Sequence, residues 1–167
     1  MLSFLDMQLL FDQYGMLVGS NFDLVRNQEG WSFAYYMLLN YDNAGHGYGN
    51  TAISSFSSNP DNLAIYGATR TADGALTVIA INKTNATITT PITIAGFTAA
   101  SSVPTYTYSN ANTGALVSSS TNTTTLASGY SFPAYSATEL VLTPNSGGAT
   151  PNSISGGISV KGGITLQ

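Results

Sequence analysis

Residues 63–82, LAIYGATRTADGALTVIAIN, decide the fold class of this chain. Two runs rich in Ile, Val, Thr and Tyr flank the four residues Thr71-Ala-Asp-Gly74. An Asp-Gly pair between two such runs is a strong signal for a β-hairpin. The stretch therefore predicts two antiparallel strands, 63–69 and 75–82, joined by a tight turn.

Further short strands follow this hairpin along the chain. We expect them at 87–94, 105–108, 116–117, 123–126, 130–132 and 138–142, with an edge or a bulge at Pro91 because proline cannot donate to a strand ladder. Short strands at roughly 8–12-residue spacing with polar turns are typical of an antiparallel sandwich. The sequence thus predicts a mainly β protein, with a loop over 43–62 and an antiparallel β-sandwich over 63–144.

The N-terminal region follows a helical period instead. Apolar residues recur at helical spacing within residues 1–18, and WSFAYYMLLNY (31–41) reads as a second helix. A short strand is expected between them at 22–25. Residues 1–42 therefore predict a helix–strand–helix appendage, the order found in part of a (β/α)8 barrel, although a full barrel needs about 250 residues.

The C-terminal tail alternates strictly. After a linker-like segment over 145–152, every even position from 154 to 166 is apolar or glycine, which predicts a strand with one buried face over 153–167. We expect this strand to fill an open sheet edge of its own domain or of a neighbouring copy. Exchange between copies, head to tail, would build a filament. The assembly residues would be Ile154, Ile158, Val160, Ile164 and Leu166.

Composition excludes several classes of partner. Only 7% of the 167 residues are charged, the net charge is −4, and no basic cluster exists, so we expect no nucleic-acid partner. The chain has no cysteine, which excludes disulfides and thiolate metal sites. The apolar stretch over 1–18 is interrupted by Asp6, Asp12 and Gln13 and lacks a basic start, so it predicts neither a signal peptide nor a membrane span.

Three stretches resemble glycoside hydrolase family 44, the endoglucanases and xyloglucanases. AYYMLLNYD (34–42) with GHGYGNT (45–51) is similar to the family's last barrel helix and the loop after it. AIYGATR (64–70) with DGALTVIAINKT (73–84) is similar to its hairpin, and FPAYSATELVL (132–142) to its closing strand. The resemblance implies a sandwich that packs beside a (β/α)8 barrel and also takes strands from the enzyme's N-terminus. This chain would hold only the last barrel helices and the C-terminal part of the sandwich.

The chain departs from the family pattern at two positions. Asn43 replaces a glycine after Asn-Tyr-Asp, and Asn50 replaces the aspartate of a Phe-Gly-Asp-Thr loop. If that aspartate binds an ion or orients the loop in the family, the change at position 50 puts this role in doubt for this chain.

Carboxyl groups suited to catalysis are scarce. Retaining glycosidases use two carboxyl groups about 5–5.5 Å apart, and the resemblance implies two glutamates on barrel strands, whereas this chain has only Glu29 and Glu139. Glu29 precedes the second helix, where the helix dipole favours an acid, and alternation predicts that Glu139 points into solvent. His46 is the single histidine and is expected to be a loop residue. We therefore expect no catalytic residue, no metal site and no cofactor.

Weaker candidates for binding and modification are aromatic and amide side chains. Tyr106 and Tyr108 share one strand face, and with Trp31 they could stack on glucan rings, although packing in the core is the competing interpretation of each. Three glycosylation sequons begin at Asn82, Asn85 and Asn122, which a bacterial source would usually leave unmodified.

Three functions follow as hypotheses. The first is the non-catalytic C-terminal sandwich of a secreted, extracellular bacterial hydrolase that degrades β-glucan polysaccharides. The second is an extracellular structural module that self-assembles with its own copies through the tail. The third is a carbohydrate-binding module, and the tail could also begin the next module of a larger secreted enzyme.

Overall fold

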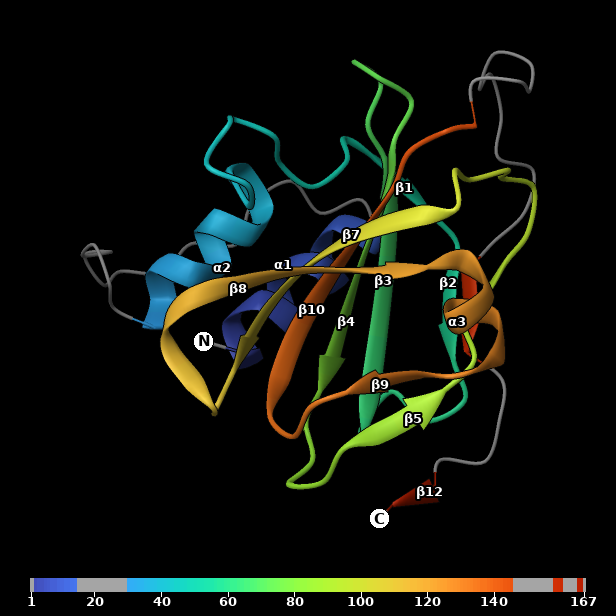
Figure 1. Cartoon of the computed structure of the whole chain (residues 1–167). Helices are drawn as coiled ribbons and strands as arrows, with labels where there is room; N and C mark the ends of the chain where they lie inside the picture. The colour runs from blue at the N-terminus through green and yellow to red at the C-terminus, as the bar shows by residue number, and fades with distance from the viewer. Residues whose placement is uncertain (1, 15–29, 146–157, 161–164, 167) are drawn as a thin grey trace.

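The protein, known here from a computed structural model, is described for residues 2–14, 30–145, 158–160 and 165–166 (Figure 1). It is mainly β, and its strands pair antiparallel with one exception in a small sheet, which confirms the predicted fold class. The elements in chain order are α1 (Leu2–Gln13), α2 (Gly30–Leu39), β1 (Thr51–Ile53), β2 (Ser55–Ser57), β3 (Leu63–Thr69), β4 (Leu76–Asn82), β5 (Ile88–Thr90), β6 (Thr93–Ile94), β7 (Ser102–Ser109), β8 (Asn112–Asn122), α3 (Thr123–Ser128), β9 (Tyr130–Phe132), β10 (Ser136–Leu142), β11 (Ile158–Val160) and β12 (Thr165–Leu166).

The main sheet has six antiparallel strands in the order β1-β3-β4-β10-β7-β8. The predicted hairpin is its centre, because β3 and β4 pair from Leu63 opposite Asn82 to Thr69 opposite Leu76. Gly74 closes the turn with a φ of 71°, in the left-handed region that glycine tolerates best.

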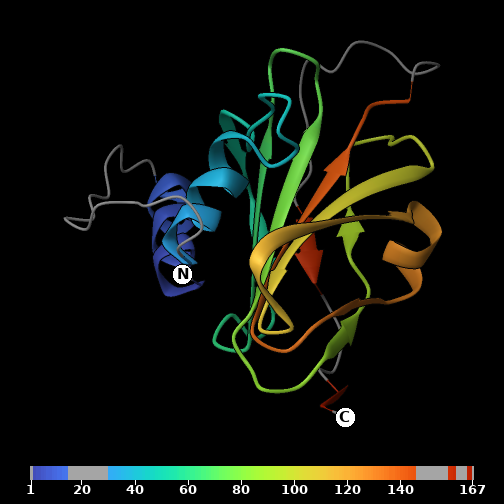
Figure 2. The same ribbon diagram turned by 60° about the vertical axis from the view of Figure 1, so that its left-hand side comes forward.

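A second layer faces one side of the main sheet. It consists of two three-stranded sheets, β2-β11-β6 and β12-β5-β9, together with α3 (Figure 2). Pro91 separates β5 from β6, so the interruption expected there is confirmed. Between the two layers lies a core of fully or almost fully buried apolar side chains, which includes Leu63, Val78, Ile88, Leu126, Phe132, Leu140 and Ile158.

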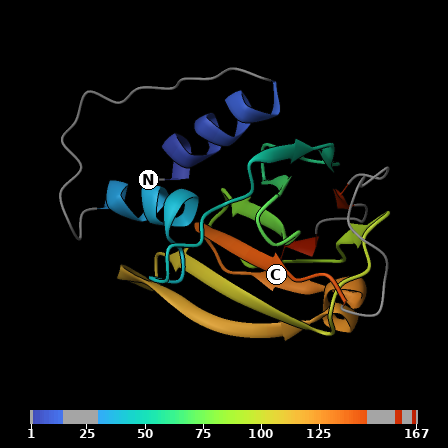
Figure 3. The same ribbon diagram turned by 90° about the horizontal axis from the view of Figure 1, so that it is seen from above.

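The two long helices cover the other side of the main sheet. Viewed from above, α1 and α2 lie next to each other over this face (Figure 3). Their contact with the sheet is a second apolar core formed by Phe4, Leu5, Leu9, Ala34, Met37, Ala64, Tyr66, Ile79, Ile81 and Ala137. Because β3 and β4 are buried on both faces, their sequences read as nearly continuous apolar runs. β10 is also buried along its whole length, although it carries Ser136, Thr138 and Glu139.

The helices of the predicted N-terminal appendage therefore form a third layer of the fold. The strand expected at 22–25 between them lies outside the described residues. No helix in the described part of the chain is long and apolar enough to cross a membrane.

Two local predictions were wrong. Residues 123–126, expected as a strand, begin α3, because the Asn122 side chain accepts a hydrogen bond from Thr125 N at 2.8 Å and caps the helix. The expected loop over 43–62 contains β1 and β2, two three-residue strands at sheet edges. Such short pieces carry too little sequence periodicity to be recognised.

The tail forms two strands in different sheets. β11 lies between β2 and β6, and β12 pairs with β5. Ile158 is 1% exposed and belongs to the core between the main sheet and the second layer, while Val160 and Leu166 lie within β11 and β12. Ile154 and Ile164 lie outside the described residues. The tail thus occupies a place within its own domain, and assembly between copies stays a prediction.

Candidate functional site

The loop over residues 40–50 connects the helical layer to the main sheet. Two of its glycines are required by close backbone approach. A Cβ atom on Gly47 would lie 2.6 Å from Leu38 O, and one on Gly49 would lie 2.6 Å from Thr69 O. The Gly49 N–H also donates to Thr77 Oγ1 at 2.8 Å. The glycine-rich sequence therefore serves to seat this loop directly on its neighbours.

Asn43 and Asn50 have clear structural roles at the positions where the chain departs from the family 44 pattern. Asn43 has a φ of 60°, in the left-handed region where glycine is favoured and asparagine is among the better-tolerated residues. Asn50 makes two hydrogen bonds with Thr71, from Nδ2 to Oγ1 at 2.9 Å and from the Thr71 N–H to Oδ1 at 3.0 Å. Asn50 thus orients the loop through its amide.

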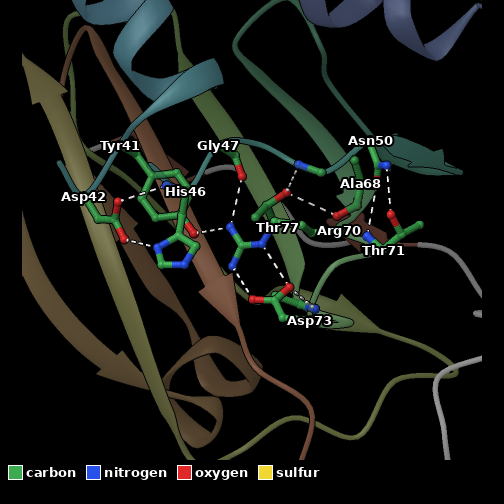
Figure 4. A network of polar contacts seen from close by, with 12 residues as sticks. Tyr41, Asp42, His46, Gly47, Asn50, Ala68, Arg70, Thr71, Asp73 and Thr77 are labelled. Atoms are coloured by element: carbon green, nitrogen blue, oxygen red, sulfur yellow. Dashed lines mark hydrogen bonds and ion pairs between the residues drawn. The ribbon is translucent and has the colours of Figure 1, made fainter. Parts of the chain in front are cut away.

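Arg70 lies at the centre of a polar network between the loop and the β3–β4 turn (Figure 4). Its Nη1 donates to Tyr41 Oη at 2.5 Å and to Gly47 O at 3.0 Å. Its Nε and Nη2 donate to the two carboxylate oxygens of Asp73 at 2.9 and 2.7 Å. This bidentate pair lowers the pKa of Asp73 and raises that of Arg70. We call these four residues the Arg70 clasp, because they join the end of α2 to the hairpin.

The side chains of Asp42 and His46 are in hydrogen-bond contact beside the clasp. Asp42 Oδ2 lies 2.5 Å from His46 Nδ1, and Asp42 Oδ1 accepts the backbone N–H of Ala44 at 2.9 Å. Burial raises the pKa of Asp42, but hydrogen bonds from His46 and from backbone N–H groups outweigh it, and the net pKa is lowered. His46 is exposed in the loop, as expected, and its ring helps to shape that loop.

Glu139 corrects the prediction of a solvated strand residue. It is 0% exposed, and neither of its carboxylate oxygens has a hydrogen-bond partner among the described residues. Alternation along β10 was interpreted as a buried face and a solvated face, whereas the structure covers both faces. Burial raises the pKa of Glu139 well above its usual range, although Arg70 opposes the shift. Opposite it on β7 lies Tyr106.

The tyrosines proposed for sugar stacking face the helical layer. Tyr108 is buried, and its ring lies 5.1 Å from that of Phe33 between centroids. Tyr106 is half-buried, and its ring lies 4.8 Å from that of Tyr41. Burial also raises the pKa of Tyr41 to about 12, with Arg70 acting in the opposite direction. Trp31 belongs to α2. Packing accounts for the contacts of Tyr106 and Tyr108, and sugar binding through these residues stays a prediction.

The three sequon asparagines differ in accessibility. Asn82 is fully buried, and its Nδ2 donates to the carbonyls of Ala86, Phe132 and Pro133 at 2.8 to 3.1 Å. Its amide therefore holds the turn after β4, and glycosylation of the folded chain at this position does not fit the structure. Asn85 and Asn122 are exposed.

The three carboxyl groups around this loop and the neighbouring strand β10 are each buried or held by a partner. Glu139 is sealed from solvent, Asp73 is held by Arg70, and Asp42 is paired with His46. Glu29 lies outside the described residues. No group of three or more His, Cys, Asp or Glu that could hold a metal ion occurs in the part of the chain that the structure describes. Sequence reasoning missed Arg70 as the centre of the clasp, since a lone arginine after a strand carries no motif.

Comparison with known proteins identifies solved structures that share this architecture. No protein-family model and no curated protein matches the sequence. Among solved structures, the chain is similar to CelM2, a bifunctional glucanase–xylanase from a metagenome library, with a TM-score of 0.74 and 24% identity over 86% of this chain and 28% of that one. It is also similar to a Paenibacillus polymyxa xyloglucanase of glycoside hydrolase family 44, with a TM-score of 0.70 and 18% identity over 83% of this chain and 28% of the enzyme.

The chain has the fold of a family 44 segment. A Clostridium acetobutylium endoglucanase of family 44 agrees, with a TM-score of 0.67 and 19% identity over 83% of this chain and 28% of that one. The resemblance drawn from residues 34–142 is thereby confirmed at the level of the fold. The chain spans about 28% of the length of each of these two family 44 enzymes, so it corresponds to a minor part of such a protein.

Proposed function

We propose that this chain is the non-catalytic C-terminal part of a secreted β-glucan-degrading glycoside hydrolase, in which it braces the catalytic barrel. The coverage of the family 44 enzymes supports this proposal, because this chain accounts for 28% of their length. In this reading the β-glucan is bound and cleaved by the remainder of the enzyme, outside the cell.

The observation that carries the proposal is the outer face of α1. One side of this helix is buried on the sheet through Leu5 and Leu9, while Met7, Leu10 and Tyr14 on the opposite side are 36%, 42% and 77% exposed. A helix that is apolar on both sides is typical of the interior of a larger protein. The uncovered side fits a surface on which further barrel elements pack.

The junction beneath this surface is built to be stiff. Near the middle of α1, Asp6 accepts from Tyr66 Oη at 2.6 Å and pairs with Lys83 at 2.7 Å. At the C-terminal end of α1, Gln13 Nε2 donates to Ser55 O at 3.2 Å. With the Arg70 clasp at the end of α2, both helices are fixed to the sandwich, so a barrel that includes them would be held in one orientation.

A chimera tests the bracing role. The corresponding C-terminal region of the Paenibacillus polymyxa xyloglucanase is replaced by this chain, with and without the pair Met7→Asp and Leu10→Asp. We expect the pair to lower the thermal unfolding temperature and the xyloglucanase activity of the chimera while leaving the isolated chain as stable as before. Phe56→Asp is the matched control, because Phe56 is an exposed apolar residue on β2, in the other layer.

Equal effects of the helix pair and of the control in the chimera would contradict bracing through α1. The absence of catalysis is tested separately, by incubating the isolated chain with carboxymethylcellulose and xyloglucan and measuring reducing ends. We expect none above background. Turnover that disappears in Glu29→Gln would overturn this part of the proposal.

A further inference from the structure

The second layer depends on a strand supplied by the tail. In the sheet β2-β11-β6, the strand β11 is central, parallel to β2 and antiparallel to β6. Neither β2 nor β6 pairs with any other strand among the described residues. The two flanking strands therefore form a slot whose backbone groups are satisfied only when an extended segment enters it.

The slot has a side-chain pocket as well as backbone partners. Ile158 is 1% exposed and packs into the core, and its backbone N–H donates to Ser54 O at 2.9 Å. Directly beneath it on the main sheet lies Gly67, where an added Cβ would be 2.3 Å from Ile158 Cδ1 and 3.0 Å from Ile53 Cγ1. Gly67 thus leaves the space that the Ile158 side chain fills.

The same tail completes the neighbouring sheet. Thr165 and Leu166 pair with Thr89 and Ile88 on β5, so one terminal segment supplies the centre of one small sheet and the edge of the other. A single segment that supplies a strand to each of two small sheets can leave both sheets together, as one unit. This is the topology in which identical elements are exchanged most simply between copies.

We propose that the slot between β2 and β6 is a strand-acceptor site, and that the tail of a second copy of this chain can occupy it. The contacts are the same whichever copy supplies the strand, so only the effective concentration of the covalently linked tail favours its own slot. For a short connection this concentration is on the order of millimolar. Exchange is therefore expected in concentrated or refolded samples, and the bracing role is independent of it.

Peptide capture tests the slot. Full-length chain carrying Ile158→Asp, whose own tail no longer fits the apolar pocket, is titrated with a fluorescent peptide of residues 153–167. We expect binding to this variant and much weaker binding to the wild type, whose slot is filled. Adding Gly67→Ala to the variant should reduce binding. Adding Gly114→Ala should not, because a Cβ there meets only Asn112 Oδ1 at 3.9 Å.

The result that overturns the site is equal binding of the normal peptide and of a peptide carrying Ile158→Asp, or no binding by a folded Ile158→Asp chain. If that variant does not fold, a protease site inserted after Ser146 in the wild type replaces it. The cleaved tail should then stay bound in native mass spectrometry and exchange with labelled peptide. Its departure from a remainder that stays folded would also refute the site.

The second copy as occupant is tested by oligomeric state. Wild-type chain refolded at high concentration should give dimers or longer assemblies in size-exclusion chromatography with light scattering. Isotope-labelled and unlabelled chains should mix within them, and Ile158→Asp should abolish them. A wild type that remains monomeric after refolding at near-millimolar concentration would exclude the second copy while leaving peptide capture to stand or fall separately.

Discussion

Arg70 at the end of the β3 hairpin arm donates a hydrogen bond to the hydroxyl of Tyr41, the second residue after α2, at 2.5 Å. The contact joins two layers of the fold that are distant in sequence. The same guanidinium reaches Gly47 O and both oxygens of Asp73, so one side chain fixes the loop and the turn together.

Arg70→Met should lower the free energy of unfolding by about 1–3 kcal/mol, because Tyr41 Oη and Gly47 O lose their buried donor. Urea unfolding followed by circular dichroism measures this change. Asp73→Asn is the control. Its side chain is 43% exposed, so loss of the ion pair should cost less than about 1 kcal/mol. Equal losses in the two variants would show that the ion pair, and not the contact with the loop, matters.

Glu139→Gln should change how stability depends on pH. Burial raises the pKa of Glu139 in the folded state above its value in the unfolded chain. The folded state therefore binds this proton more tightly, and wild-type stability is full below the unfolded pKa and falls as pH rises toward the folded pKa. The glutamine variant has no carboxyl group to titrate at this position. Between the unfolded and the folded pKa of Glu139, its free energy of unfolding should therefore rise relative to that of the wild type by at most about 1.4 kcal/mol per pH unit.

Urea unfolding at a series of pH values between 4 and 8 tests this prediction. Asp61→Asn, at an exposed position, is the matched control, because it removes one carboxylate without altering the buried site. Parallel curves for Glu139→Gln and the wild type would contradict a carboxyl that is buried and unpartnered.

Gly49→Ala should destabilise the chain by about 1–3 kcal/mol, the usual range for forcing extra atoms into a packed site. The added Cβ would lie 2.6 Å from the backbone of Ala68 and Thr69, which belong to β3 and cannot move aside easily. Thermal unfolding gives the comparison, with Gly114→Ala on the exposed strand β8 as the matched substitution. A Gly49→Ala protein as stable as the Gly114→Ala protein would mean that the loop does not rest on β3.

Asn122→Ala should cost about 1 kcal/mol, because α3 loses the side-chain oxygen that accepts the Thr125 N–H. Asn122→Asp keeps such an acceptor and should retain most of the stability. Since both substitutions remove the sequon, a difference between them measured by chemical denaturation reports on the cap and not on glycosylation. Identical losses of stability in the two variants would show that the Asn122 side chain does not stabilise α3 as a cap.

The hairpin could be predicted because its information is local. Asp73-Gly74 fixes a turn, and the flanking apolar runs are neighbours in sequence that pair with each other across it. The strand prediction for residues 123–126 failed for an equally local reason. Threonine favours strands, but Asn122, which precedes the threonines, caps a helix. The two strands within 43–62 exist only because neighbouring strands pair with them, which no short sequence window reports.

The candidate site was harder to predict because it depends on contacts between the helical layer and the main sheet, which are far apart in sequence. The outward direction given to Glu139 followed from assuming a sandwich with one solvated face, and the covering helices come from a region more than 95 residues away along the chain. Arg70 has no motif, and its partners Tyr41 and Gly47 lie 29 and 23 residues from it in sequence. The sequence shows that Asn43 stands where the family 44 pattern has a glycine. Only the backbone φ angle of Asn43 shows why these two residue types occur at this position.

A main sheet covered on both faces has a practical consequence for where the chain can be cut. The change in sequence character after Asp42 suggests a natural place to trim the helices and keep the strands. Trimming there would strip Tyr66, Ile79, Ile81 and Ala137 of the helices that cover them. A strands-only version should therefore expose this apolar face and aggregate, so a shortened chain has to keep α1 and α2 together with the strands.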